Sequence, residues 1–153
     1  MFTLVPSQFF DPATARQALA EVADLKEGDT VGHLALPQYN AVLVYTTDGD
    51  SVIVDGVPEI YRLLTRLPDC PEYNKILCSR NGDKLLLAVA QGKNLLLANS
   101  FPARDFTTAE YYIFLTLKSL QLNPEISTIC WRSGLDAEDE MSLYRYFKAV
   151  VKL

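Results

Sequence analysis

The sequence predicts an α/β fold, because three apolar strands in quick succession are followed by a capped helix and a fourth strand. The three strands are expected at residues 75–79, 85–90 and 95–100, joined by short turns that contain glycine. They should therefore be antiparallel neighbours in one sheet. The second and third are nearly continuous runs of Leu, Ala and Val, so both of their faces are expected to be covered.

Residues 107–121 give the clearest helix signal. Thr107 and Glu110 form a capping box, in which each side chain satisfies an orphan backbone donor of the first turn. Phe106 and Tyr111 stand at the two positions of a hydrophobic staple around that cap. The sequence therefore predicts that the helix begins at Thr107.

The C-terminal segment predicts a fourth strand, a last helix and a fifth strand. The fourth strand is expected at residues 127–131 as a parallel strand of the fold, and the fifth at residues 149–153. Asp136 is suited to cap the helix between them, whose acidic first turn matches the helix dipole. Leu143 and Phe147 should form its buried side.

The N-terminal half predicts strands at residues 2–5, 31–36 and 41–46. Asp11 and Pro12 suit the N-cap and the first position of an intervening helix. Its apolar face is expected to comprise Ala15, Leu19, Val22 and Ala23.

A further helix is predicted around residues 58–67, since Pro58 suits an early helical position and Pro68 ends a helix. The segment Val52-Ile53-Val54 before it is either a short strand or the lead into that helix. The apolar face of this helix is expected to comprise Ile60, Leu63, Leu64 and Leu67.

The order of strand, strand, strand, helix, strand and helix is that of one half of an actin-like ATPase or ribonuclease H-like domain. Pro68-Asp69-Cys70-Pro71 is the best linker in the chain, because two prolines resist both helix and sheet. We therefore predict two parts: residues 1–70 as a partial first ribonuclease H-like half, and residues 71–153 as the second half.

Composition excludes several classes of function. The 153 residues carry a formal net charge of -5 and no basic cluster, which argues against a nucleic-acid partner. No apolar run approaches the roughly 20 residues of a membrane-spanning helix, and the N-terminus lacks the features of a secretory signal. Both observations favour a cytoplasmic location. Cys70, Cys78 and Cys130 have no zinc-ligand or disulfide-framework spacing, and buried thiols are expected.

Catalytic and metal-binding patterns are sparse, so no catalytic residue is assigned. His33 is the single histidine, it lies in a strand-like segment, and the chain has no nucleophile-elbow motif. A structural or surface role is favoured for it. Asp48, Asp50 and Asp55 cluster around a turn, but their spacing departs from that of a calcium loop, and a solvated acidic turn is favoured over a metal site.

Phosphate binding requires backbone donors at a glycine-rich turn, and the chain has neither of the two common glycine-rich phosphate motifs. Arg80-Asn81-Gly82-Asp83 is the one turn in the right topological place, between the first and second strands of the second half. An ordinary type I′ hairpin is the favoured interpretation.

Aromatic residues are concentrated in two C-terminal helices. Tyr111, Tyr112 and Phe114 cover more than one face of the long helix, so packing on the sheet with one side against another element or subunit is favoured. Tyr144 and Tyr146 beside Phe147 invite the same interpretation. Any exposed remainder would mark a site for a protein partner.

Several segments together resemble an uncharacterised bacterial family with an actin-like ATPase fold, the domain of unknown function 3822. The likeness covers nearly the whole chain and is structural. It is carried by Phe2-Thr3-Leu4-Val5-Pro6-Ser7 with the following aromatic residue and Asp11, Leu95-Leu96-Leu97-Ala98-Asn99-Ser100-Phe101, Thr108-Ala109-Glu110-Tyr111-Tyr112, Leu120 and Leu122 before Pro124, and Tyr144-Arg145-Tyr146-Phe147.

The resemblance implies two ribonuclease H-like halves in tandem, relative to which this chain is N-terminally truncated. It begins at the expected fourth strand of the first half, so the first of two phosphate hairpins is missing. The second would fall at residues 80–84, which lack the family pattern of an aspartate and a glycine followed by small hydroxyl residues. The glycine pair that contacts adenosine is reduced to Gly134.

The sequence thus predicts a non-catalytic, cytoplasmic protein-interaction or scaffold module derived from the actin-like ATPase fold, without a cofactor. A homo-oligomer is expected, because a truncated half exposes sheet edges. One alternative is a nucleotide-binding protein of the actin-like ATPase type with a site between the halves. ATP and Mg²⁺ would then bind at Asn81, Gly82 and Asp83. Another alternative is a small-ligand sensor near residues 48–55.

Overall fold

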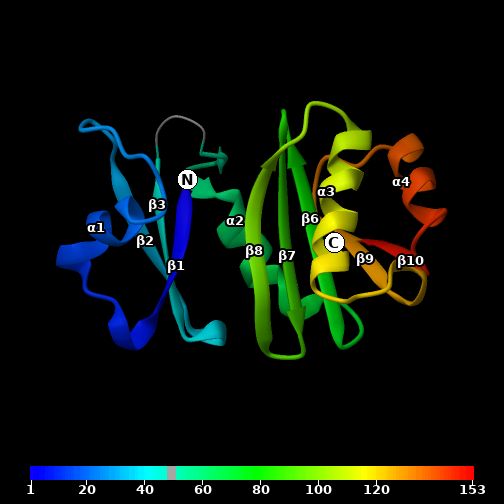
Figure 1. The fold of residues 1–153 in the computed structure, drawn as a ribbon, viewed down its shortest axis with the longest axis horizontal. Helices are drawn as coiled ribbons and strands as arrows, with labels where there is room; N and C mark the ends of the chain where they lie inside the picture. The colour runs from blue at the N-terminus through cyan, green and yellow to red at the C-terminus, as the bar shows by residue number, and fades with distance from the viewer. Residues whose placement is uncertain (48–50) are drawn as a thin grey trace. The chain divides into compact units, whose positions relative to one another are not determined.

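The computed structural model describes residues 1–47 and 51–153, which form two compact units, Met1–Arg62 and Leu63–Leu153 (Figure 1). Each unit has its own β-sheet and is described by itself. Helix α2 (Glu59–Arg66) contains both Arg62, at which the first unit ends, and Leu63, at which the second begins. The 3₁₀ turn η4 (Leu67–Asp69) follows it within the second unit.

The larger unit has a five-stranded sheet with the order β10-β9-β6-β7-β8. The first three strands along the chain are antiparallel, β9 runs parallel to β6, and β10 runs parallel to β9. The predicted mixed α/β topology is therefore confirmed. The bounds are β6 Asn74–Asn81, β7 Lys84–Gln91, β8 Asn94–Pro102, β9 Thr128–Trp131 and β10 Ala149–Lys152.

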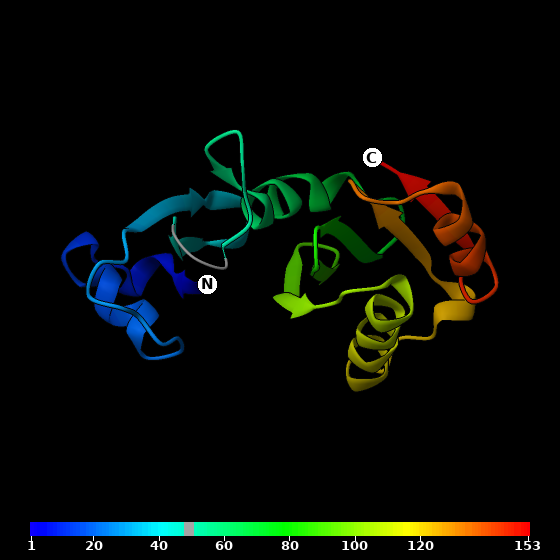
Figure 2. The ribbon, with the colours of Figure 1, turned by 90° about the horizontal axis from the view of Figure 1, so that it is seen from above.

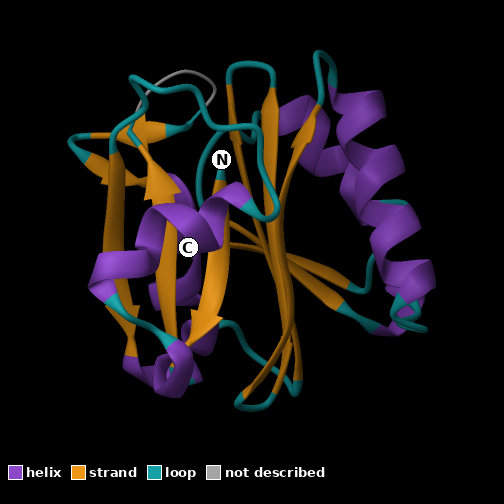
Figure 3. Cartoon of the chain, turned by 60° about the vertical axis from the view of Figure 1, so that its left-hand side comes forward, coloured by secondary structure: helices purple, strands orange, loops and turns teal. Residues whose placement is uncertain are grey.

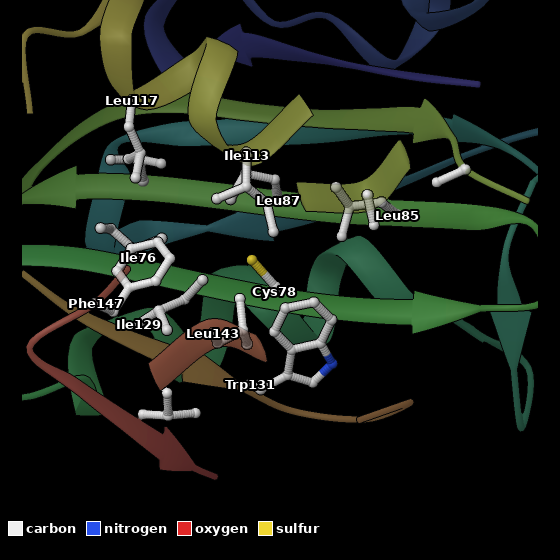
Figure 4. Packing of buried hydrophobic residues seen from close by; sticks show 14 residues of the cluster. Ile76, Cys78, Leu85, Leu87, Ile113, Leu117, Ile129, Trp131, Leu143 and Phe147 are labelled. Atoms are coloured by element: carbon white, nitrogen blue, oxygen red, sulfur yellow. The ribbon is translucent and has the colours of Figure 1, made fainter. Parts of the chain in front are cut away.

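Helices α3 (Phe106–Ser119) and α4 (Ala137–Tyr144) pack on the same face of this sheet. Figure 2 shows this arrangement from above, and Figure 4 shows side chains of α3 lying against those of β6 and β7. Burial of this many apolar side chains is the main source of stability of the unit. The core comprises Ile76, Cys78, Leu85, Leu87, Val89, Ala103, Ala109, Ile113, Leu117, Ile129, Trp131, Leu143, Phe147 and Val150.

The register between β6 and β9 assigns side chains to the two faces. Cys78 lies opposite Trp131 and both belong to the core under α3 and α4. Leu77 lies opposite Cys130, one residue earlier in each strand. Since side chains alternate along a strand, Leu77 and Cys130 point to the other face. The turn η4 contacts β6 and β7.

Helix α3 begins one residue earlier than predicted, and its cap differs. Asp105 is the N-cap, and its carboxylate accepts a hydrogen bond of 2.7 Å from the backbone N–H of Thr108. The predicted capping box of Thr107 and Glu110 is wrong. A carboxylate at Asp105 is a strong acceptor for the first turn, and Glu110 instead accepts from Ser142 on α4.

The end of the chain follows the prediction. Asp136 caps α4 by accepting a hydrogen bond of 2.8 Å from the backbone N–H of Asp139, and Leu143 and Phe147 are buried. Strand β8, by contrast, is not covered on both faces, because it lies at the edge of the sheet and Leu96 is 38% exposed. The central strand β7 is buried along its length, as predicted.

The smaller unit has a three-stranded antiparallel sheet with the order β1-β3-β2. Helix α1 (Ala15–Ala20) lies across one face of it, where Ala15 and Leu19 pack against Val42 and Val44 (Figure 3). The strands are β1 Phe2–Pro6, β2 Val31–Leu36 and β3 Ala41–Thr46, close to the predicted ranges, and the hairpin β4 (Ile53–Val54) with β5 (Val57–Pro58) follows.

Two details of this unit bear on the predictions. Asp11 caps the 3₁₀ turn η2 (Pro12–Thr14), and its carboxylate accepts from the N–H of Ala13. Val22 is 66% exposed, so its assignment to the apolar face is wrong, because α1 already ends at Ala20. Further 3₁₀ turns are η1 (Ser7–Phe9), η3 (Pro37–Tyr39) and η5 (Pro124–Ile126).

The predicted apolar face of the helix before the linker is confirmed, because Ile60, Leu63, Leu64 and Leu67 are all buried. The division into a partial half over residues 1–70 and a second half over residues 71–153 stays a prediction. Among the described residues, no helix is long and apolar enough to cross a membrane.

Candidate functional site

The candidate site is the end of the five-stranded sheet at which the parallel strands β6 and β9 both terminate. In α/β folds, ligands bind beyond the carboxyl ends of parallel strands. At this end lie the β6–β7 hairpin and the loop from β9 to α4. The site therefore combines the predicted residues Asn81, Gly82 and Asp83 with residues of the second loop, Ser133 and Gly134.

The hairpin loop consists of Gly82 and Asp83, because Asn81 pairs with Lys84 in the sheet. Gly82 has a φ of +59°, whereas Asp83 is not among the residues with positive φ. Positive φ at the first central residue alone is the pattern of a type II′ turn. A two-residue hairpin is therefore present, but the prediction that Asn81 and Gly82 form its loop in a type I′ turn is wrong, because Asn81 remains paired in the strand and the loop is shifted by one residue.

The polar groups of the hairpin make hydrogen bonds within the unit. The amide nitrogen Nδ2 of Asn81 donates to Oγ of Ser79 at 3.0 Å. The backbone carbonyl of Asp83 accepts a bond of 2.7 Å from the N–H of Ala103, which follows β8. These contacts fix the hairpin to its own strand and to the end of β8.

Ser79 and Ser133 join the two parallel strands at this end. Their hydroxyl oxygens lie 2.8 Å apart, and Ser79 is fully buried. The carbonyl of Ser133 also accepts from the backbone N–H of Arg80 at 2.9 Å and from Nε1 of Trp131 at 2.6 Å. Sequence reasoning missed both serines, although a serine within a buried apolar strand is the signal that points to Ser79.

Position 134, in the loop after β9, requires a glycine. Its φ is +79°, and a Cβ at this position would lie 2.1 Å from the carbonyl oxygen of Arg80. The loop after β9 therefore packs directly on the backbone of β6. The family resemblance places this glycine where an adenosine-contacting pair is expected. What the structure shows is that it allows the close approach of two backbones.

Arg80 extends the site towards the N-terminus of α3. Its Nη2 donates to the carbonyl of Arg104 at 2.9 Å, while its Nε is buried without a hydrogen-bond partner among the described residues. The Thr108 backbone N–H holds the pKa of Asp105 below its usual range, and the charge of Arg80 contributes in the same direction. Burial and the neighbouring Asp136 raise the pKa of Asp139, which Arg80 partly offsets.

This arrangement offers few free donors for a phosphate. The side chains of Ser79, Ser133 and Asn81 are already bonded to one another. Asp83 adds a carboxylate to the hairpin itself, where it would repel an anionic ligand unless a cation were also bound. The described residues contain no group of three or more His, Cys, Asp or Glu side chains placed to hold a metal ion.

The other candidate residues lie apart from this site along the chain. His33 is on β2, is exposed, and its ring lies 5.0 Å from that of Phe10. Asp48 and Asp50 of the predicted acidic turn lie outside the described residues. Asp55 is exposed in the β4–β5 turn with a φ of +51°. The three cysteines are buried free thiols, as predicted.

Comparison with known proteins identifies the family. Residues 56–150 match the family described as protein of unknown function (DUF3822), which is more than half of the chain. The chain belongs to this DUF3822 family. The predicted family resemblance is therefore confirmed.

A solved structure shows the same fold as this DUF3822 member. It is a Bacteroides thetaiotaomicron protein described as having an actin-like ATPase fold and unknown function, with a TM-score of 0.74 and 19% sequence identity. The match covers 99% of this chain and 64% of that one, so the chain spans less than two thirds of that protein's length. A search of curated proteins found no match.

Proposed function

We propose that this DUF3822 chain is a non-catalytic protein-interaction or scaffold module, and that its binding surface lies on α3 and α4. The observation that carries the proposal is a set of large apolar side chains exposed on these helices and just after them. We call this set the aromatic surface. It comprises Tyr111, Leu115, Met141, Tyr144 and Tyr146, which are 46–69% exposed.

The aromatic surface is supported by contacts that join the two helices. Tyr111 and Leu115 are four residues apart on α3 and therefore lie on the same side of it. The ring of Phe114 on α3 lies 4.9 Å from that of Tyr146, in an edge-to-face arrangement. The hydroxyl of Ser142 on α4 donates to the carboxylate of Glu110 on α3 at 3.0 Å.

The composition of this surface is that of a protein-binding site. Tyr and Met are enriched at protein interfaces, and tyrosine is one of the three residue types enriched among those that contribute most binding energy. Tyrosine has an apolar ring and a polar hydroxyl, so its side chain can be exposed to water when no partner is bound. It has only two χ angles and therefore loses little side-chain entropy on binding. Several such side chains together favour a protein partner over a small ligand.

The candidate site at the sheet end supports the non-catalytic part of the proposal. Its buried hydroxyl and amide groups are bonded to one another, which gives them a role in holding β6, β9 and the hairpin together. Phosphoryl transfer relies on positioned cations and on groups aimed at the reacting phosphate. The hairpin instead presents the carboxylate of Asp83.

We further propose a homo-oligomer in the cytoplasm. Strand β1 is an edge strand of its sheet, and an open edge can pair with the same strand of a second copy across a two-fold axis. The three cysteines are free thiols, which suits a reducing compartment.

A second candidate function is nucleotide binding at Asn81, Gly82 and Asp83. The observation that favours it is the glycine turn of the β6–β7 hairpin, with Arg80 and Lys84 flanking it in sequence. ATP would bind there with Mg²⁺, whose charge would offset that of Asp83.

Affinity capture with matched variants tests the interaction surface. Tyr111→Lys combined with Leu115→Lys should remove proteins that the unmodified chain retains, because charges replace exposed apolar contacts. Tyr73→Lys is the control, since Tyr73 is 64% exposed but lies outside the aromatic surface. The proposal would be contradicted if the doubly substituted chain still retained the same proteins. It would also be contradicted if Tyr73→Lys lost them to the same extent.

A further inference from the structure

Two of the three cysteines form a pair that links separate elements of the larger unit. Cys70 ends the turn η4, and Cys130 lies on β9, 60 residues later in the chain. The thiols of Cys70 and Cys130 lie close enough for each to shift the pKa of the other. This contact fits the backbone arrangement, because η4 packs on β6, and β9 pairs with β6 beside Leu77.

The third cysteine is separated from this pair by the sheet. Cys78 belongs to the core under α3 and α4, where Figure 4 shows it among Trp131, Leu143 and Ile113. Trp131 lies opposite Cys78, and Cys130 precedes Trp131 on β9. Since side chains alternate along a strand, Cys130 points to the other face of the sheet. The chain thus contains one thiol pair and one isolated buried thiol.

We propose that Cys70 and Cys130 are a reversible dithiol modification site, which a low-molecular-weight disulfide of the glutathione class oxidises to an intramolecular disulfide. The disulfide would link the end of η4, before the first strand of the five-stranded sheet, to strand β9 of that sheet. A closed loop of this length restricts the unfolded chain strongly, so the oxidised form should resist unfolding more than the reduced form.

The surroundings of the pair assign different roles to the two sulfurs. The neighbouring Cys70 thiol lowers the pKa of Cys130, and the Lys75 ammonium acts in the same direction, against burial and the charge of Glu72. The neighbouring Cys130 sulfur, together with burial, raises the pKa of Cys70. The ammonium of Lys75 is held close by, since it donates to the backbone carbonyl of Cys70. Because Lys75 belongs to β6, it continues to favour the Cys130 thiolate when the segment around Cys70 moves, so Cys130 is the attacking sulfur and Cys70 the resolving one.

The reaction proceeds by two exchanges. The Cys130 thiolate attacks one sulfur of glutathione disulfide, forming a mixed disulfide and releasing one glutathione thiolate, which takes up a proton. Cys70 then loses its proton and attacks the Cys130 sulfur of the mixed disulfide, which releases the second glutathione. The two protein thiols lose two electrons and two protons in total, and the glutathione disulfide gains them. Excess reduced glutathione reverses both steps.

Both sulfurs are shielded, so the exchange requires local opening. Cys70 is 2% exposed and Cys130 is fully buried. The linker of two prolines around Cys70 is the part that must move, because β9 is an interior strand of the sheet. Oxidation should accordingly be slow under native conditions and faster at urea concentrations below the unfolding transition.

The test uses the full chain and mass spectrometry without reductant. After incubation with glutathione disulfide, peptide mapping should show a Cys70–Cys130 disulfide, and dithiothreitol should remove it. Cys78→Ser is the matched control and should form the disulfide to the same extent. Cys70→Ser should stop at a mixed disulfide on Cys130, and circular dichroism confirms that each variant is folded.

Alkylation provides a second readout that does not depend on the disulfide. In the reduced Cys70→Ser and unmodified chains, iodoacetamide should label Cys130 before Cys78, whose pKa is raised by burial. A disulfide that involves Cys78 would overturn the proposal. So would the absence of any intramolecular disulfide after prolonged incubation in sub-denaturing urea, with the chain shown to be folded.

Discussion

The hydroxyl of Ser79 lies 2.8 Å from that of Ser133, which joins the end of β6 to the loop after β9. Ser79 also accepts from the side chain of Asn81, so one buried hydroxyl connects both loops of the candidate site. The polar groups that would otherwise face a ligand therefore hold the sheet end together. This relationship supports the proposal that this end of the sheet has a structural role and does not bind phosphate.

Substitution of Ser79 should destabilise the chain. Ser79→Ala removes both hydrogen bonds at a buried position, and a loss of about 1 kcal/mol in the free energy of unfolding is expected. Urea unfolding followed by circular dichroism measures it. Ser7→Ala, at an exposed position, is the control and should change little. An unchanged midpoint for Ser79→Ala would show that the serine network contributes nothing to stability.

Gly134 should tolerate no side chain. Gly134→Ala forces a Cβ to within 2.1 Å of the Arg80 carbonyl at a φ of +79°, so the loop must shift or β6 must distort. We expect a loss of roughly 2–4 kcal/mol, from backbone strain and overpacking together. Gly28→Ala is the matched control, because a Cβ there meets nothing within 4 Å. Equal thermal stability of the two variants would contradict the described loop.

Substitutions at the N-terminus of α3 should show which residue caps the helix, Asp105 as in the structure or Thr107 as the sequence predicted. Asp105→Ala should lower the urea midpoint, because the first turn loses its acceptor for the Thr108 N–H. Thr107→Ala, at the cap that the sequence predicted, should have a much smaller effect. The reverse ranking would restore the capping box and displace the start of the helix.

Glu110 should make stability depend on pH. Burial raises the pKa of Glu110 in the folded chain, which the hydrogen bond from Ser142 partly offsets. A carboxyl group with a raised folded pKa favours folding while it is protonated, so this contribution is lost as the pH rises through the interval between the unfolded and folded pKa values. Glu110→Gln keeps an acceptor for Ser142 and should flatten the decline between mildly acidic and neutral pH.

The expected difference for Glu110→Gln is a gain in unfolding midpoint at neutral pH that shrinks towards acidic pH. Glu125→Gln, at an exposed position in the turn η5, serves as the reference. Parallel stability profiles for the unmodified chain and Glu110→Gln would show that Glu110 is as well solvated when folded as when unfolded.

Strand and helix positions in the larger unit could be predicted because their signals are local. The strands around Leu77, Leu87 and Leu97 are apolar runs separated by Gly82 and Gly92, and both glycines adopt positive φ in the loops. Asp136 was recognisable as a cap because an acidic turn follows it directly. Such short-range patterns depend little on the rest of the fold.

The errors arose where tertiary structure decides between local alternatives. Thr107 and Asp105 are both acceptable caps, and the path of the chain from β8 selects the second. Leu96 lies in an apolar run but belongs to an edge strand, which only the strand order reveals. The contact between Ser79 and Ser133 joins residues 54 positions apart, so no local pattern carries it.

The most direct test of the central claim is a calorimetric titration of the folded chain with ATP and Mg²⁺. The account predicts no saturable heat, even at nucleotide concentrations well above those of tight binding, because the hairpin groups are engaged within the sheet end. A saturable heat that disappears with Asp83→Ala would contradict it and would place a working nucleotide site at the β6–β7 hairpin.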